Sequence, residues 1–471
     1  MARVWPPLLR LPPELLLKIA RCIDSHDTFF SFLDILGSPK VRGALEHIFQ
    51  LGLVHSRDGL WPQLWTYCAI MENTTTRSSL EAAIPLYESV VVACNDTLTW
   101  LLGYLQPHTT IQWVADFPRS ETTTFNGASM AVENWYDRWA QLPWIKVQCR
   151  TRPSPLFFAV LPRCTKLVCL DLRGHRIPLD VVFKYAASSP TLVELFLRSH
   201  GLLNMYKDEP LPATTIGYAV KWLRSARVQT FHFATWTWAA DVDTSLRQEF
   251  YATMVGCPTL SSLTLSNCPI SHAPFPRCPD THVTFPSLSP RLRSLALSRC
   301  PMTTNFLSDL ASTLPTSSIE DLRLSHLVVF SYFSPEILVV AFKNLLHAVA
   351  QSNITTLSLC NCDLHDAAWH DLSPLLQQSN LQHVRLVRNG ITGVGAVWIG
   401  RALQRNASVR TLDLSYNAID VDGAIELVHC MAHRAVPMDE IRLKRNTISS
   451  PDKPRLEALA LALGIQRLTL A

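Results

Sequence analysis

The chain has 471 residues, of which 48% are hydrophobic and 17% charged, and its formal net charge is +4 at pH 7. This composition excludes an intrinsically disordered chain, and so small a net charge does not by itself indicate binding to nucleic acid or to a membrane. The length exceeds the usual size of one compact core, a limit that does not apply when each unit packs only on its neighbours.

The first segment, residues 1–66, predicts a small all-α domain of three short helices. Pro12 and Pro13 suit a helix start and Glu14 suits its first turn. Asp27 or Thr28 is expected to cap the second helix, and VRGALEHIFQLGL reads as the third. Apolar residues recur along one face of the first helix, at Leu15, Leu16, Ile19 and Ile23.

The opening LPPELLLKIARCI resembles the start of an F-box. The match falls on Leu11, Pro12, Glu14, Leu15, Leu16 and Ile19, and is continued by Asp27 and Phe29. The Val-Ser-Arg-x-Trp-like stretch of that family is absent, because GSPKVRGALEHIF stands in its place and Trp61 and Trp65 arrive late. The resemblance implies that a Skp-type adaptor is bound by Leu11, Pro12, Leu15, Leu16, Ile19, Ile23 and Phe29. Alternatively, the domain is a helical cap over the open edge of a repeat array.

Residues 67–160 predict an irregular linker with degenerate repeats. ENTTTRSS and residues 121–127 are polar and typical of turns. The segments IQWVADF, from Ile111, and LPWIKVQC, from Leu142, place apolar residues at the first and fourth positions of the repeat described next.

Residues 161–471 repeat one pattern, LxxLxLxxNxL. Its clearest copies start at Ile354, Leu381, Val409 and Met438, which are 27, 28 and 29 residues apart. This is the consensus of a leucine-rich repeat, and the alternation at positions 4 and 6 predicts a strand with one buried face. Other strands are expected from the starts at Leu167, Leu192, Val228, Leu260, Leu292, Ile319 and Ile465, which makes eleven.

In six of these copies, position 9 carries Asn or Cys where the chain leaves the strand. We expect Asn389, Asn417 and Asn446 to bond to loop backbone groups that would otherwise be buried without partners. Cys268, Cys300 and Cys362 occupy the same position, which predicts a packing role.

The segment after each strand reads as a helix, as in TGVGAVWIGRALQRNA. The copies resemble the ribonuclease-inhibitor class of repeat, which implies an α/β solenoid: an arc with a parallel sheet on its concave face and helices outside.

Side chains at positions 2, 3, 5, 7 and 8 are expected on that concave face. We expect Arg385 to stack with Arg442, and Arg388 with Arg445, with Tyr416 between the latter two. Such basic groups around an aromatic ring suit an acidic peptide, a phosphopeptide or another carboxylate-rich surface. The alternative is a solvated sheet face with local ion pairs, such as that of Arg410 or Arg442 with Asp413. The predicted partner-binding residues are Arg299, Arg323, Arg385, Arg388, Tyr416, Arg442 and Arg445.

The sequence contains no catalytic motif, so we expect neither an enzyme nor a bound cofactor. His429 and His433 are four residues apart on a predicted helix but lack a third ligand nearby, so no metal site is expected. The 13 cysteines show no disulfide spacing, and free thiols point to a reducing compartment. Residues 1–23 do not resemble a signal peptide and 337–350 are too short to span a bilayer, which predicts an intracellular protein, cytoplasmic or nuclear.

These features favour a non-enzymatic recognition protein. By resemblance it would be the substrate receptor of a cullin-type (SCF) ubiquitin ligase, with a Skp-type adaptor and an unknown, acidic target as partners and no role for nucleic acid or membrane. A second hypothesis is a leucine-rich-repeat scaffold, inhibitor or sensor without an F-box. A third is a regulator resembling the Ran GTPase-activating proteins, which would supply Arg173 or Arg198 in trans.

Overall fold

A computed structural model of the protein describes residues 11–118, 121–125, 128–151, 153–174, 177–198, 210–234, 236–268, 288–302, 304–326, 328–329 and 335–470. The chain divides into two compact units, Met1–Phe196 (unit 1) and Leu197–Ala471 (unit 2).

Fifteen strands form one parallel sheet in which neighbouring strands follow one another in chain order. Unit 1 contributes β1 (Leu64–Thr66), β2 (Ser89–Val92), β3 (Thr110–Trp113), β6 (Trp144–Cys149) and β7 (Cys169–Arg173), and β8 (Glu194–Arg198) spans the boundary between the units. Unit 2 contributes β9 (Thr230–Ala234), β10 (Ser262–Ser266), β11 (Ser294–Ser298), β13 (Asp321–Ser325), β15 (Thr356–Cys360), β16 (His383–Arg385), β17 (Thr411–Asp413), β18 (Glu440–Arg442) and β19 (Leu468–Thr469).

Two small sheets lie outside this series. β4 (Thr122–Phe125) and β5 (Ala128–Ala131) pair antiparallel where the sequence predicted only turns, and β12 (Pro301–Met302) pairs parallel with β14 (Val328–Val329).

The expected α/β architecture is confirmed. Each of the eleven strands expected from Leu167 onward is present, and in all but the last of them the apolar residues at positions 4 and 6 are buried. Most of the proline-rich segment 266–291 lies outside the described residues.

The repeat series begins earlier than the sequence indicated. β1, β2, β3 and β6 pair in parallel in that order, so strands of the main sheet run through the residues expected to form an irregular linker with degenerate repeats. The phase expected for the two degenerate copies is wrong: Ile111 pairs with Val90, and Val147 with Leu170, which places Ile111 and Val147 at position 4. The apolar residues at Ile111 and Leu142 misled the alignment because both segments are apolar at more than one phase.

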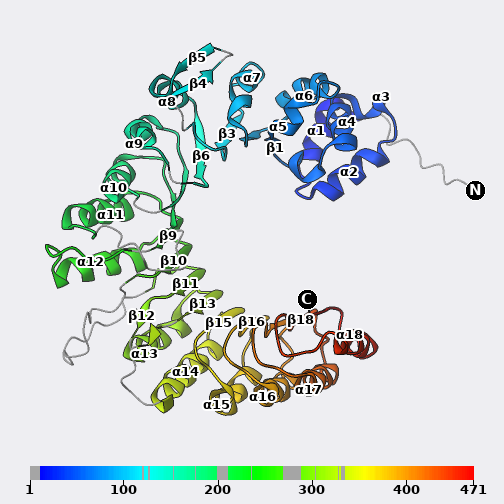
Figure 1. The fold of residues 1–471 in the computed structure, drawn as a ribbon, viewed down its shortest axis with the longest axis vertical. Coiled ribbons are helices and arrows are strands. Elements are labelled where there is room, and N and C mark those ends of the chain that lie inside the picture. The colour runs from blue at the N-terminus through cyan, green and yellow to red at the C-terminus, as the bar shows by residue number, and fades with distance from the viewer. Residues whose placement is uncertain are drawn as a thin grey trace, which may run out of the picture. The chain divides into compact units, whose positions relative to one another are not determined.

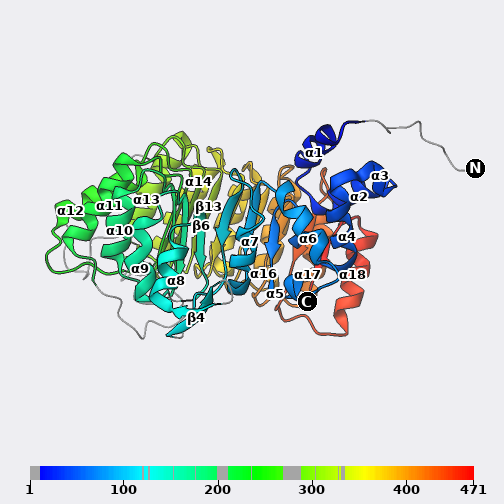
Figure 2. The same ribbon diagram turned by 90° about the horizontal axis from the view of Figure 1, so that it is seen from above.

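The helices of the N-terminal segment are α1 (Pro13–Arg21), α2 (His26–Ile35), α3 (Pro39–Arg42) and α4 (Glu46–Val54), and they gather at one end of unit 1 (Figure 2). The cap of α2 is Ser25, whose hydroxyl accepts a hydrogen bond from Thr28 N, rather than Asp27 or Thr28. Arg42 is buried, where it forms an ion pair with Glu46 and donates to Leu33 O, 3.2 Å away.

An aromatic pair is central to the packing of the helical segment on the first repeat. Phe29 of α2 stacks on Trp61 with ring centroids 3.8 Å apart, and Trp61 Nε1 donates to Ile23 O at 2.6 Å. Counting back from β1, Trp61 occupies position 1 of the first repeat. These contacts close the apolar edge of the repeat series.

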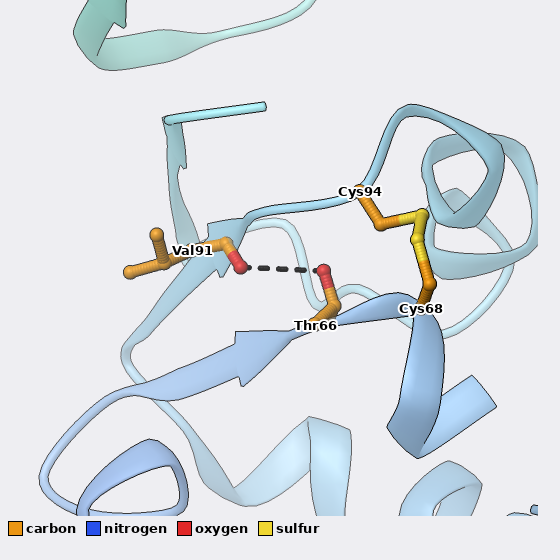
Figure 3. The surroundings of a disulfide bond; sticks show 4 residues. All are labelled: Thr66, Cys68, Val91 and Cys94. Carbon is orange, nitrogen blue, oxygen red and sulfur yellow. Dashed lines mark hydrogen bonds between the residues drawn. A yellow bond between two sulfur atoms is a disulfide. The ribbon is translucent and has the colours of Figure 1, made fainter. Parts of the chain in front are cut away.

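A disulfide joins the first two repeats, which corrects the expectation that the cysteines lack disulfide pairs. Cys68 follows β1 and Cys94 follows β2, and a bond links their sulfurs (Figure 3). If Trp61 and Tyr87 are taken as position 1, both cysteines fall at position 8. Equivalent positions on paired strands lie about 5 Å apart, which is within the span of a disulfide. Beside them, Thr66 Oγ1 donates to Val91 O at 3.2 Å.

The other helices of unit 1 are α5 (Cys68–Glu72), α6 (Arg77–Ala83), α7 (Leu98–Leu102), α8 (Val132–Trp139), α9 (Pro155–Val160) and α10 (Leu179–Ser188). Between α8 and the sheet, buried tryptophans take the place of the usual leucines. Trp113, Trp139 and Trp144 pack with ring centroids 5.2–5.8 Å apart. These large side chains fill the core where the leucines of the repeat pattern are missing.

In unit 2 each helix follows a strand, and most consecutive helices pack on each other. The helices are α11 (Ala213–Ser225), α12 (Thr244–Val255), α13 (Thr304–Thr313), α14 (Pro335–Ala350), α15 (Asp366–Gln377), α16 (Gly393–Gln404), α17 (Val421–Ala432) and α18 (Asp452–Ala462). From α13 onward they cover one face of the strands (Figure 1). We call the opposite face of β11 to β18 the open face. Within the described part of the chain, no helix combines the length and apolarity needed to cross a membrane.

The polar groups at position 9 join consecutive repeats, as expected. Asn417 Nδ2 donates to Leu386 O and Leu414 O, both at 2.9 Å. Its Oδ1 accepts from Asn389 N at 2.8 Å and from Ile391 N at 3.2 Å. One buried amide therefore satisfies four backbone groups that water does not reach.

In some repeats a cysteine at position 9 makes part of the same backbone contacts. The buried thiol of Cys268 lies 3.3 Å from Phe233 O and 3.1 Å from Ser266 O, and Cys300 and Cys362 make the equivalent contacts. A thiol can donate weakly to these carbonyls but lacks the carbonyl oxygen with which Asn accepts from the neighbouring backbone. The predicted packing role is confirmed, with a hydrogen bond added to it.

We expect Asn417→Leu to lower the free energy of unfolding by about 3–5 kcal/mol, because it leaves several buried backbone groups without partners. Denaturant unfolding followed by circular dichroism measures this loss. Asn380→Leu, at an exposed position, is the matched control. Asn417→Cys should recover part of the loss. Equal effects of Asn417→Leu and Asn380→Leu would contradict the structural role of the position-9 side chains.

We expect the double change Cys68→Ser and Cys94→Ser to lower the free energy of unfolding by about 3 kcal/mol, because the disulfide restricts the unfolded chain. The exposed, free Cys22 offers a control, Cys22→Ser, that should have little effect. Alkylation of the denatured protein followed by intact mass measurement checks the bond itself. Modification of all 13 cysteines without a reductant would show that no disulfide had formed.

Candidate functional site

The register of unit 2 brings the position-5 residues into one row across the open face. Ala296, Arg323, Ser358 and Arg385 are consecutive partners on β11, β13, β15 and β16. Asp413 follows on β17, and Arg442 comes after it on β18. Arg385 and Arg442 thus lie in one row at position 5 of alternate repeats, with the carboxylate of Asp413 between them.

The position-8 residues form a second row with a shared backbone conformation. All have positive φ, from 50° to 59°, namely Asn267, Arg299, His326, Asn361, Arg388, Tyr416 and Arg445. Except at Arg445, each of these N–H groups donates to the position-7 carbonyl of the next repeat, as Arg388 N does to Ser415 O at 3.2 Å. This extends the backbone hydrogen bonding of the sheet beyond the strands and offsets the cost of the left-handed conformation.

A depression of about 440 Å³ opens between these two rows. It is lined by Ala296, Leu297, Ser298, Arg323, Ser325, His326, Ser358, Cys360, Asn361, Arg385, Val387, Arg388 and Tyr416. Four residues of the predicted binding set, Arg323, Arg385, Arg388 and Tyr416, meet there. The other three, Arg299, Arg442 and Arg445, are not part of the lining.

Sequence reasoning missed the middle of this depression. β15 contributes Ser358 and Cys360, and Asn361 follows them, while His326 follows β13. These residues at positions 5, 7 and 8 are neutral or small, so they carry none of the charge that marks a binding residue in the sequence. Their positions in the template were the available signal.

The arginines at position 5 are paired with carboxylates. Arg323 holds Asp321 with two contacts, Nε at 3.0 Å and Nη2 at 2.7 Å. Arg385 Nε lies 3.5 Å from Asp413 Oδ2. These are local ion pairs of the kind that the alternative interpretation expected. Asp413, however, is paired with Arg385 and not with Arg410.

Beyond the depression, Arg442 Nη2 lies 2.6 Å from Glu440 Oε2. The hydrogen bond from Arg442 is the main cause that holds the pKa of the Glu440 carboxyl below its ordinary value. Much of the charge of Arg442 is therefore balanced within its own strand.

The arginines at position 8 differ. Among the described residues, no carboxylate forms an ion pair with Arg299, Arg388 or Arg445. The guanidinium of Arg388 lies over the ring of Tyr416, 4.7 Å from its centroid. Tyr416 thus contacts Arg388 as a neighbour in the row. Stacking of this kind restricts an exposed guanidinium while leaving its N–H groups at the edge available.

The positive charges of these arginines affect the pKa of His326. Partial burial of the imidazole and the nearby charges of Arg299 and Arg388 together lower the pKa of His326 below its ordinary value. The depression therefore has a positive local potential, in which an anion would be favoured. No group of three or more metal-ligating side chains occurs in the described chain, and His433 Nδ1 lies 2.7 Å from His429 O.

The structure separates the residues predicted to bind an adaptor into two groups. Leu15 and Ile19 on α1 are 41% and 36% exposed, and Pro12 is also exposed. Leu16 and Phe29 are buried inside unit 1, where Phe29 contacts Trp61. The remaining two, Leu11 and Ile23, are half-buried.

We expect Arg388→Gln to raise the pKa of His326, because removal of a nearby positive charge favours the protonated imidazolium. The shift can be followed by NMR titration of histidine-labelled protein, with His326→Gln identifying the signal. Arg405→Gln changes an exposed arginine outside the depression and should leave the His326 titration unchanged. An equal shift in both variants would mean that Arg388 does not act on His326 locally.

Comparison with known proteins adds a family match for one repeat. Residues 405–428 match the family model described as "Leucine Rich repeat". Among solved structures, similar chains include the actin-binding site 2 of leiomodin-1 (15% identity, 30% of this chain and 66% of that one, TM-score 0.19). Another is internalin C2 of Listeria monocytogenes (17% identity, 54% of this chain and 84% of that one, TM-score 0.27). The aligned part spans just under two thirds of the leiomodin chain. No curated protein sequence matches this chain. With its fifteen parallel strands in chain order and its position-9 ladder, the fold is a leucine-rich-repeat solenoid.

Proposed function

We propose that this chain is a non-enzymatic recognition protein, the substrate receptor of a cullin-type ubiquitin ligase. The N-terminal helices would bind a Skp-type adaptor, and the open face of unit 2 would bind the target protein. The observation that carries the adaptor half is the pair Leu15 and Ile19, which lie one helical turn apart on α1 and remain exposed.

Helix α1 has apolar side chains on two sides. Leu16 and Ala20 are buried, so the helix needs them for its own packing. Leu15 and Ile19 are not needed for that packing, and an exposed apolar pair at this spacing is typical of a helix that packs on a partner. Leu53, Val54 and Ile35 add exposed apolar surface on α4 and α2.

A freestanding repeat scaffold is the second candidate, and one observation favours it. The contact of Phe29 with Trp61 makes the helical segment a cap for the first repeat whether or not it binds an adaptor. Capping and adaptor binding use different side chains, so the two roles are compatible. For the GTPase-regulator hypothesis we find less support, because Arg173 lies 3.7 Å from Asp171 and is half-buried.

We expect the double change Leu15→Asp and Ile19→Asp to weaken binding of the full-length chain to a purified Skp-type adaptor by about 100-fold. The loss of two buried apolar contacts, roughly 3 kcal/mol, gives this magnitude. Binding is measured by pull-down and by calorimetry.

Leu461→Asp is the matched control, because Leu461 also lies on a helix and its side chain is 74% exposed. It should leave adaptor binding unchanged, and circular dichroism should show that all variants are folded. If the folded wild-type chain does not bind the adaptor, the ligase role is wrong and the N-terminal helices are a cap only.

A further inference from the structure

The depression on the open face owes its shape to one strand of small residues between two cationic ones. Ser358 and Cys360 on β15 form its floor. On one side stand Arg323 of β13 and the following His326, and on the other stand Arg385 of β16 and the following Arg388. Long side chains on neighbouring strands with a short one between them leave a hollow about two strand spacings, roughly 10 Å, across.

The carboxylates near this hollow neutralise only part of the positive charge around it. Asp321 forms an ion pair with Arg323, and Asp413 forms one with Arg385. Arg388 has no carboxylate partner within the described chain, and its guanidinium is held against Tyr416. In the pair with Asp321, Arg323 uses Nε and Nη2, so Nη1 takes no part. Within the described chain, Arg388 on one wall therefore has no carboxylate partner, and Arg323 on the other wall keeps Nη1 outside its ion pair.

We propose that this depression binds the phosphate of a phosphorylated serine or threonine in an extended segment of the target protein. The inference rests on the proposed recognition function of the open face but not on the adaptor contact.

Three features favour phosphate over a carboxylate. A carboxylate is satisfied by the fork of one arginine, whereas a phosphate monoester carries nearly two charges and three acceptor oxygens. The donors here come from two strands that are not adjacent, so a group with several acceptors is needed to bridge them. The positive potential that acts on His326 arises from Arg299 and Arg388 together, and a dianion offsets it more fully than a monoanion.

The surroundings favour a peptide over a small molecule. Small-molecule sites enclose most of the ligand, whereas this depression is open along the sheet face. Val387 and the ring of Tyr416 provide apolar contacts beside the cations. An extended chain lying over the sheet would place the phosphate between the walls and its neighbouring residues on these apolar groups.

The test uses the full-length chain and three fluorescent peptide libraries that are degenerate except at a central residue, fixed as phosphoserine, serine or glutamate. Binding is measured by fluorescence anisotropy at near-physiological salt. We expect the phosphoserine library to bind at least tenfold more tightly than the other two. Arg388→Gln should reduce that binding about tenfold, and adding Arg323→Gln should abolish the preference for phosphoserine.

Arg405→Gln is the matched control, since it makes the same change of charge at an exposed arginine outside the depression. It should retain the phosphoserine preference, and each variant should keep the wild-type melting temperature. Equal binding of the three libraries, no binding of the phosphoserine library up to about 1 mM, or an equal loss in Arg388→Gln and Arg405→Gln would overturn the inference. The same preparations are tested for adaptor binding, so a chain that binds the adaptor without this preference disproves only the phosphate site.

Discussion

Every repeat of this solenoid depends on satisfying the backbone groups that are buried where the chain leaves a strand. A sheet built only from leucines would bury those carbonyl and amide groups without partners. Asn417 shows the solution, since its one side chain bonds to backbone groups of two neighbouring repeats. Because each amide belongs to one repeat and serves the one before it, the hydrogen bonds couple the repeats as the leucine core does.

Much of the fold could be predicted because this requirement leaves a mark on the sequence. From Leu167 onward, the apolar alternation located the strands, and in six repeats the Asn or Cys at position 9 marked where the chain leaves the strand. In residues 67–160 the pattern failed for a physical reason: Trp113, Trp139 and Trp144 fill the core with larger side chains, so fewer leucines are needed. YESVVVACN, from Tyr87, fits the template and was overlooked, and with it the position shared by Cys68 and Cys94.

The candidate site was only partly predictable. The template shows which side chains face away from the helices, so the arginines of the open face could be named. Their charge balance depends on which acidic residue each one reaches, and that followed from the register: Arg385 is paired with Asp413, whereas Arg388 is placed over Tyr416. The hollow itself depends on the absence of bulk at Ser358, which no search for charged or aromatic residues would reveal.

The disulfide between the first two repeats has a consequence for how the protein comes apart. In a repeat array each unit contacts only its neighbours, so the array behaves as a one-dimensional chain of coupled switches whose ends fray first. Cys68 and Cys94 tie the first two units covalently, and Phe29 on Trp61 covers the first of them. Fraying from this end must therefore open two repeats and the helical cap in one step. Under reducing conditions the same end becomes free to open one repeat at a time.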